Sequence, residues 1–236
     1  MLPRRTHEIS RLEAFSDAVF AFALTLLVVS LQVPKSYGEL MNLMSGFPAF
    51  ACCFGVLLWI WYEHNLFFRR YGLQDPYTVL LNGALLFVVM FYVYPLKFMF
   101  DSGFSQFLPG ASQGAVPMTL AQLAHASTIY GLGFVALFVM FALLYEHAYR
   151  RRHDLGLKPL EVFDVRSFAG QQIVSAAVGV IVVLIAVAAP RRYAFMSPMA
   201  FIFMWPAHGL YEAWTKKKRK ALEATLPPEP MPMSAS

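Results

Sequence analysis

The chain has 236 residues, of which 58% are hydrophobic, 16% aromatic and only 14% charged, and its formal net charge is +5. Because soluble domains usually carry about 25% charged residues, this composition argues against a water-soluble protein. The basic residues stand at the ends of apolar segments rather than along a solvated face, which argues against nucleic-acid binding. The adjacent Cys52 and Cys53 lie within an apolar segment and indicate no disulfide framework.

Six stretches are long and apolar enough to span a bilayer as helices, which takes about 20 residues each. They cover approximately residues 12–33, 47–68, 77–100, 123–149, 168–189 and 193–214. Pro198 and Pro206 interrupt the last stretch, so we expect a kink there. The sequence thus predicts an all-α integral membrane protein with six transmembrane helices over residues 1–214. A basic, then Pro-rich, cytoplasmic tail follows over residues 215–236, and we expect disorder after Lys220.

The basic residues also predict the orientation of the chain. If the N-terminus is cytoplasmic, the outer loops hold only four of the 19 Lys and Arg residues, namely Lys35, Lys97, Arg191 and Arg192. The positive-inside rule then places both termini in the cytoplasm. The pair Arg191 and Arg192 runs against this trend, whereas the basic run that begins at Lys216 supports it.

Several ionisable residues stand near one end of the first two predicted helices. Arg11 and Asp17 are six residues apart, about 9 Å along a helix axis, which is too far for an easy direct pair. His64 lies at the cytoplasmic end of the second predicted helix and so at the same membrane level. We therefore expect a network of Arg11, Asp17 and His64 that locks the two helices together. A proton-handling role for this network is the alternative.

The sequence offers little for catalysis. It has no histidine pair at metal-ligand spacing within a segment and no Gly-rich phosphate loop. Ser16, next to Asp17, has no base arranged to activate it. We therefore predict neither an enzyme nor a metal site, and no cofactor.

Two sequence patterns carry a family resemblance. R-x-x-x-F-S-D begins at Arg11 and leads into an apolar helix, and W-x-x-H begins at Trp61. Together they resemble the lysosomal potassium channel family and its bacterial homologues. Asn82 and Pro95 in the third predicted helix stand where that family tends to carry Asn and Pro. The resemblance covers residues 10–100 well and the remainder only through its topology.

The resemblance implies a six-helix subunit without a re-entrant pore loop, and the chain indeed has no T-V-G-Y-G filter. It implies a homotetramer whose four first helices line a central pore. It further implies an inter-helix hydrogen-bond network of Arg11, Ser16, Asp17, Trp61, His64 and Asn82.

The resemblance also implies a pore constriction on the first helix. The apolar bottleneck falls on Phe22, followed by Leu26 and Val29, which recur on one helical face. Thr25 falls at a polar layer that would influence selectivity. Without the resemblance, the apolar stripe would be interpreted as packing or lipid-facing surface. Phe22 departs from the Ile or Leu that the family usually has at this position, which leaves open whether Phe22 or Leu26 forms the narrowest point.

The expected function is that of a potassium-permeable cation channel with a hydrophobic gate, in the plasma membrane of a bacterium. Because no carbonyl-lined filter is visible, we expect modest selectivity. The expected partners are further copies of the chain, membrane lipid and the permeant potassium ion. One alternative is a proton-coupled transporter or proton channel that uses Asp17 and His64, and another is a non-conducting membrane scaffold. The role of the charged segment at residues 150–166 is left open as a regulatory linker or a simple connector.

Overall fold

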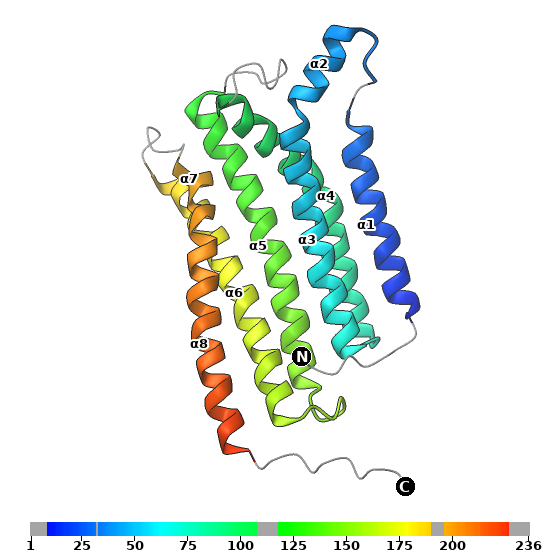
Figure 1. Ribbon diagram of the computed structural model, residues 1–236, viewed down its shortest axis with the longest axis vertical. Coiled ribbons are helices and arrows are strands. Elements are labelled where there is room, and N and C mark those ends of the chain that lie inside the picture. Colours follow the sequence, from blue (N-terminus) through cyan, green and yellow to red (C-terminus); the bar gives the residue numbers. More distant parts are fainter. Residues whose placement is uncertain (1–8, 32, 108–117, 190–195, 227–236) are drawn as a thin grey trace.

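The computed structural model describes residues 9–31, 33–107, 118–189 and 196–226, and all regular structure within these ranges is helical. Five of the helices there are long and apolar enough to cross a membrane. They stand side by side as an upright bundle (Figure 1). Their bounds are α1, Arg11–Val29; α3, Phe47–Tyr71; α4, Pro76–Phe107; α5, Leu120–Arg150; and α6, Pro159–Ala188.

The start of α1 is determined by local sequence. Ser10 Oγ accepts a hydrogen bond from the Glu13 backbone N–H at 3.2 Å, and Glu13 Oε2 accepts one from the Ser10 backbone N–H at 2.7 Å. This capping box satisfies two backbone donors that a helix otherwise leaves open at its first turn. The helix therefore begins at Arg11, immediately before the apolar run.

The core of the bundle lies between α3, α4 and α5. Its largest fully buried side chains are aromatic and aliphatic, among them Phe67, Leu85, Tyr92, Leu137 and Phe141. The helix α1 packs against α3 and α4 at one edge of this core. The pore-helix candidate is thus an edge element of the subunit rather than its centre.

The helices α5 and α6 approach each other closely through two glycines. A Cβ atom at Gly131 would lie 2.7 Å from Val183 Cγ2, and one at Gly179 would lie 2.8 Å from Val135 Cγ2. A larger side chain at either position would have to displace these valines, so glycine at both positions allows the close approach of the two helices. Small residues at a helix contact are a common way to pack helices within a membrane.

The sixth predicted span is not confirmed. Its residues form a short helix α7, Met196–Met199, a 3₁₀ helix η2, Ala200–Phe203, and then α8, Met204–Thr225. In the described part of the chain, α8 does not reach the apolarity of a membrane span, because it carries Glu212 and the basic run from Lys216. The interruption expected from Pro198 and Pro206 is present as the 3₁₀ turn between them.

Further boundaries differ from the sequence expectations. The helix α1 ends at Val29 rather than at residue 33, and α4 continues past residue 100 to Phe107. The helix α6 begins at Pro159, ahead of the predicted 168. About half of the charged segment at residues 150–166 is therefore helix, and the connector is a set of turns over residues 151–156. The helix α8 continues past the expected tail boundary at residue 214 to Thr225, where we had expected disorder after Lys220. An additional short helix, α2 (Tyr37–Ser45), lies between α1 and α3. The expectations for Arg191 and Arg192 and for residues 227–236 fall outside the described residues.

Candidate pore helix and its polar network

The helix α1 has one face buried within the subunit. Four side chains spaced three or four residues apart on this face are buried, namely Ser16, Phe20, Ala23 and Leu27. A spacing of three and four residues keeps them on one side of a helix with 3.6 residues per turn. This face attaches α1 to α3 and α4.

The opposite face of α1 is uncovered. Phe22 is 54% exposed and Val29 is 71% exposed, while Thr25 is exposed and Leu26 is half-buried. The Thr25 hydroxyl donates to the Ala21 carbonyl at 2.9 Å, so its own helix satisfies its hydrogen while its oxygen still has a free lone pair. Three of the four side chains proposed for the pore, Phe22, Thr25 and Val29, therefore lie on the part of α1 that the rest of the subunit leaves open, and Leu26 lies at its edge.

Asp17 connects α1 to α3. The Trp61 Nε1–H donates to Asp17 Oδ1 at 2.8 Å. This pair joins the F-S-D pattern of the first helix to the W-x-x-H pattern of the second. A hydrogen bond to a charged acceptor is stronger than one between neutral groups, so the pair holds the lower half of α1 against α3.

Ser16 begins a second chain of contacts that reaches α3 by way of α4. Asn82 Nδ2 donates to Ser16 Oγ at 2.9 Å, and Asn82 Oδ1 lies 2.8 Å from His64 Nε2. All three side chains are buried. One residue from each of α1, α4 and α3 thus meets in a continuous buried chain.

The directions of these bonds follow from the donors available. The single hydroxyl hydrogen of Ser16 goes to the Leu12 carbonyl at 2.8 Å, so Ser16 Oγ can only accept from Asn82. The amide NH₂ of Asn82 therefore points to Ser16 and its oxygen points to His64. It follows that His64 Nε2 carries a hydrogen and donates it to Asn82 Oδ1.

The structure keeps these two sets of contacts separate and leaves Arg11 out of both. The side chain of Arg11 is exposed, and no hydrogen bond or ion pair joins it to Asp17 or His64 among the described residues. Asp17 binds Trp61, whereas His64 binds Asn82. The direct association of Arg11, Asp17 and His64 that we expected is therefore not formed, because the helix faces direct Asp17 and His64 to different partners.

A lysine at the other end of α1 was missed by the sequence analysis. Lys97 Nζ of α4 donates to the Ser30 carbonyl at 3.2 Å and to Ser30 Oγ at 2.7 Å. Ser30 is the C-cap of α1, and a cation is favoured there by the negative end of the helix dipole. The contact fixes the end of α1 that lies farthest from Asp17, and only the assembled bundle could reveal it.

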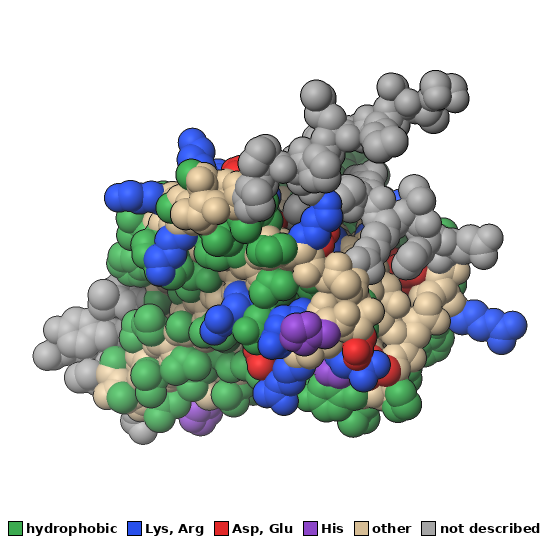
Figure 2. All heavy atoms as spheres, turned by 90° about the horizontal axis from the view of Figure 1, so that it is seen from below, with side chains coloured by type: hydrophobic (Ala, Val, Ile, Leu, Met, Phe, Trp, Pro, Cys, Tyr) green, Lys and Arg blue, Asp and Glu red, His purple; other side chains and the backbone are tan. Residues whose placement is uncertain are grey.

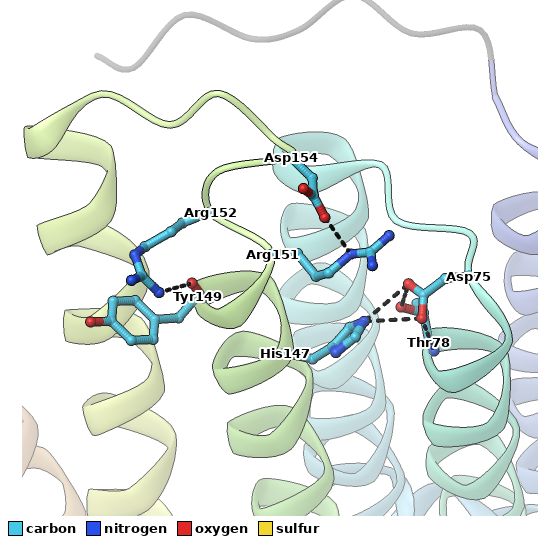
Figure 3. Close-up of polar contacts among 7 residues, drawn as sticks. All are labelled: Asp75, Thr78, His147, Tyr149, Arg151, Arg152 and Asp154. Atoms are coloured by element: carbon cyan, nitrogen blue, oxygen red, sulfur yellow. Dashed lines mark hydrogen bonds and ion pairs between the residues drawn. The ribbon is translucent and has the colours of Figure 1, made fainter.

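A histidine–aspartate pair between α5 and the α3–α4 turn was also missed. Figure 3 shows the His147 ring directed at the Asp75 carboxylate, with Nε2 3.0 Å from each carboxylate oxygen. Asp75 also accepts from the backbone N–H of Thr78 at 3.3 Å and from its hydroxyl at 2.7 Å, which is the arrangement of a helix N-cap. Burial alone would raise the pKa of Asp75, but the hydrogen bonds from Thr78 and His147 outweigh it and lower this pKa from 3.8 to about 2.

The sequence comparisons match the part of the chain that carries these contacts. Residues 11–92 match the family described as endosomal/lysosomal potassium channel TMEM175. A potassium channel from Marivirga tractuosa is 35% identical over 224 residues, which cover 90% of this chain and 90% of that protein. The chain belongs to the TMEM175 family. A second relative, a potassium channel from Chamaesiphon minutus, is 31% identical over 149 residues, which cover 60% of this chain and 66% of that protein.

A solved structure of a TMEM175 protein agrees with the fold. The crystal structure of a variant of the potassium channel MtTMEM175, in complex with a nanobody–MBP fusion protein, superposes with a TM-score of 0.79 at 32% identity. The match covers 91% of this chain and 97% of that one. The predicted family is therefore confirmed, and membership in a channel family agrees with the prediction that the chain is not an enzyme.

Proposed function

We propose that this TMEM175-family chain forms a homotetrameric, potassium-permeable cation channel of modest selectivity, with α1 of each subunit lining a central pore. The observation that carries the proposal is the division of α1 into two faces. Its buried face is attached to α3 and α4, while the face with Phe22, Thr25 and Val29 has no cover within the subunit. Four copies facing a common axis would cover this stripe and enclose a pathway.

The side chains on the open face suit a hydrophobic gate. Phe22, Leu26 and Val29 present rings and branched aliphatic groups, and a narrow ring of such groups excludes water and the hydrated ions it carries. Thr25 adds a hydroxyl oxygen with a free lone pair at the same level. We propose Phe22, Leu26 and Val29 as the constriction and Thr25 as the polar layer that biases ion choice, with potassium as the permeant ion and no resident cofactor.

The charge distribution supports the proposed orientation in a plasma membrane, with both termini cytoplasmic. Figure 2 shows the end of the bundle that holds the start of α1, the α3–α4 turn and the α5–α6 connection, and Lys and Arg side chains are spread across it. A cytoplasmic surface is expected to carry such an excess of basic residues. This orientation places the Trp61–Asp17 pair near the cytoplasmic side of the membrane and Lys97 near the outer side.

A proton-coupled transporter was the main alternative. A relay would need Asp17 and His64 to exchange a proton, but Asp17 is bound to Trp61 and His64 to Asn82. No contact among the described residues favours this alternative over a channel.

The test is ion flux through the purified protein in liposomes that hold a potassium gradient, read with a proton-sensitive dye, together with native mass spectrometry of the oligomer. We expect tetramers that pass potassium in preference to sodium, and unitary current steps in a planar bilayer. Saturating transport without unitary steps would overturn the channel in favour of a carrier. No flux from an intact tetramer, also after Phe22→Ala, would overturn it in favour of a scaffold.

A further inference from the structure

The helix α8 also has two distinct faces. Its inner face packs on α6, where the Tyr211 hydroxyl donates to the Ser167 carbonyl at 3.1 Å and Arg219 Nε donates to Asp164 Oδ1 at 3.0 Å. Its outer face is exposed and carries Leu210, Trp214, Lys217 and Lys218. Trp214 follows Leu210 by four residues, and Lys217 and Lys218 follow Trp214 by three and four, so a single stripe runs from apolar and aromatic groups to two ammonium groups.

The charges of the basic run on α8 divide according to these faces. Lys216 is paired with Glu212 at 2.7 Å, and Arg219 is paired with Asp164 and, at 3.8 Å, with Glu223. Among the described residues, Lys217 and Lys218 have no carboxylate partner. Lys218 Nζ instead lies 3.8 Å from the centre of the Trp214 ring, which is a cation–π contact. The outer face therefore holds positive charge that no carboxylate in the described part of the chain neutralises.

The position of α8 in the bundle determines what can cover this face. The helix stands at the edge of the subunit opposite α1 (Figure 1) and packs against α6 and η2. If α1 faces the axis of the proposed tetramer, the outer face of α8 points away from that axis and toward lipid. This placement rests on the proposed function and makes a second copy of the chain a poor candidate for the occupant.

The chemistry of the stripe matches one class of lipid. Tryptophan is enriched at the membrane–water interface, and lysines next to a membrane attract anionic headgroups. We propose that the α8 outer face, formed by Leu210, Trp214, Lys217 and Lys218, binds anionic phospholipids of the cytoplasmic leaflet, with the acyl chains on Leu210 and the phosphate at the two lysines.

The neighbouring cavity between α6 and α8 is not the site of this binding. It has a volume of about 360 Å³ and is lined in part by Asp164, Glu212, Lys216 and Arg219. Its two cations are already paired with its two carboxylates, so an added phosphate would meet no unneutralised positive charge. The anionic headgroup is therefore expected on the outer face alone.

The test is native mass spectrometry of the full chain in detergent, titrated with phosphatidylglycerol or with phosphatidylcholine of the same acyl chains. We expect tighter binding of phosphatidylglycerol, and a weakening of roughly 10- to 30-fold in Lys217→Gln/Lys218→Gln, because each interfacial lysine contributes about 1 kcal/mol. Lys216→Gln/Arg150→Gln makes the same change of net charge away from the outer face, because Lys216 is paired with Glu212 and Arg150, on α5, with Glu146. This control is expected to alter binding much less.

Three results would overturn the inference: no preference of the wild type for phosphatidylglycerol, no loss in Lys217→Gln/Lys218→Gln, or an equal loss in both double variants. An equal loss would mean that the net charge of the protein, rather than the outer face of α8, attracts the lipid. Because the assay measures lipid binding and not ion flux, a result that overturns the lipid-binding proposal does not contradict the proposed channel. Absence of flux in liposomes would in turn leave the lipid preference measurable.

Discussion

The Trp61 indole nitrogen donates a hydrogen bond to the Asp17 carboxylate across 2.8 Å, and this bond joins the two helices that carry the family patterns. A second connection runs from Ser16 through Asn82 to His64. Both connections begin at neighbouring residues of α1 but reach α3 by different routes. Consecutive residues on a helix point about 100° apart, so the Ser-Asp pair allows α1 to engage α3 directly and α4 at the same level.

Trp61→Phe should weaken the attachment of α1 to α3. The substitution keeps an aromatic ring but removes the indole donor, which leaves the half-buried Asp17 carboxylate without this partner at a cost of about 1–3 kcal/mol. We expect a lower apparent melting temperature of the protein in detergent. Trp205→Phe, at a position 84% exposed, is the matched control and should melt like the wild type. Equal melting of Trp61→Phe and the control would show that the bond contributes little.

Asn82→Leu should destabilise the protein more than Ser16→Ala. Leucine leaves both the Ser16 oxygen and the His64 Nε2–H buried without their partner, and each such group costs about 1–3 kcal/mol. Ser16→Ala removes the hydroxyl group itself, so the only group left without a partner is one N–H of the Asn82 amide. The melting temperatures of the two variants, measured in the same detergent, show which substitution destabilises the protein more. A smaller loss in Asn82→Leu than in Ser16→Ala would contradict the role of Asn82 as the bridge between Ser16 and His64.

Asp75→Ala should lower stability near neutral pH and remove part of the sensitivity to acid. The pKa of Asp75 is lowered to about 2 in the folded chain, so the folded state favours the ionised carboxylate. Its contribution to stability is complete above the ordinary pKa of 3.8 and is lost as the pH falls through about 2. As an N-cap, Asp75 should contribute about 1 kcal/mol.

Melting curves of this variant at pH 7, 5, 3.5 and 2.5 provide the measurement, and the gap from the wild type should narrow only in the most acidic samples. Asp154→Ala is the control, because Asp154 is 64% exposed in its pair with Arg151 (Figure 3) and exposed pairs contribute little. A gap that stays constant down to pH 2.5 would show that the charge of Asp75 does not stabilise the fold.

Much of the bundle could be predicted because it depends on local properties of the sequence. The apolar runs of α3, α4 and α5 are long and end at polar or basic residues, so length and hydropathy located α3 and α5 within three residues at each end and α4 at its start. The end of α4 lies seven residues beyond the prediction, because the helix continues through the polar residues that follow Phe100. The contacts of Asp17 and His64 with other helices were expected because ionisable groups near a membrane need partners. The pattern did not show which partner each would take, since that depends on the direction of the helix faces in the folded chain.

The remaining features depend on packing that the sequence does not reveal. Glu161, Asp164 and Arg166 interrupted the apolar pattern, so the first turns of α6 were assigned to a connector, although α8 covers Asp164 there through Arg219. Asp75 and His147 are far apart in sequence and come together only when α5 packs beside α4. Both cases involve a polar residue whose partner comes from another helix.

Phe22→Ala should raise potassium flux at least severalfold if Phe22 forms the constriction. Replacing four rings by methyl groups widens the pathway and admits water, which lowers the barrier that a dry apolar ring sets against ions. The matched control is Phe87→Ala on α4, because Phe87 is 73% exposed but lies on a helix that is not proposed to line the pore. Flux in liposomes and the oligomeric state should be measured on the same preparations.

The outcome of this substitution also separates the two candidate narrow points. If Phe22→Ala leaves flux unchanged while the protein remains tetrameric, Phe22 is not the constriction, and Leu26→Ala should then raise flux in its place. If neither variant changes flux, the open face of α1 does not line the pathway, and its exposed stripe is a lipid-facing or subunit-packing surface. If Phe22→Ala and Phe87→Ala raise flux equally, the gain reflects general loosening of the bundle rather than a wider gate.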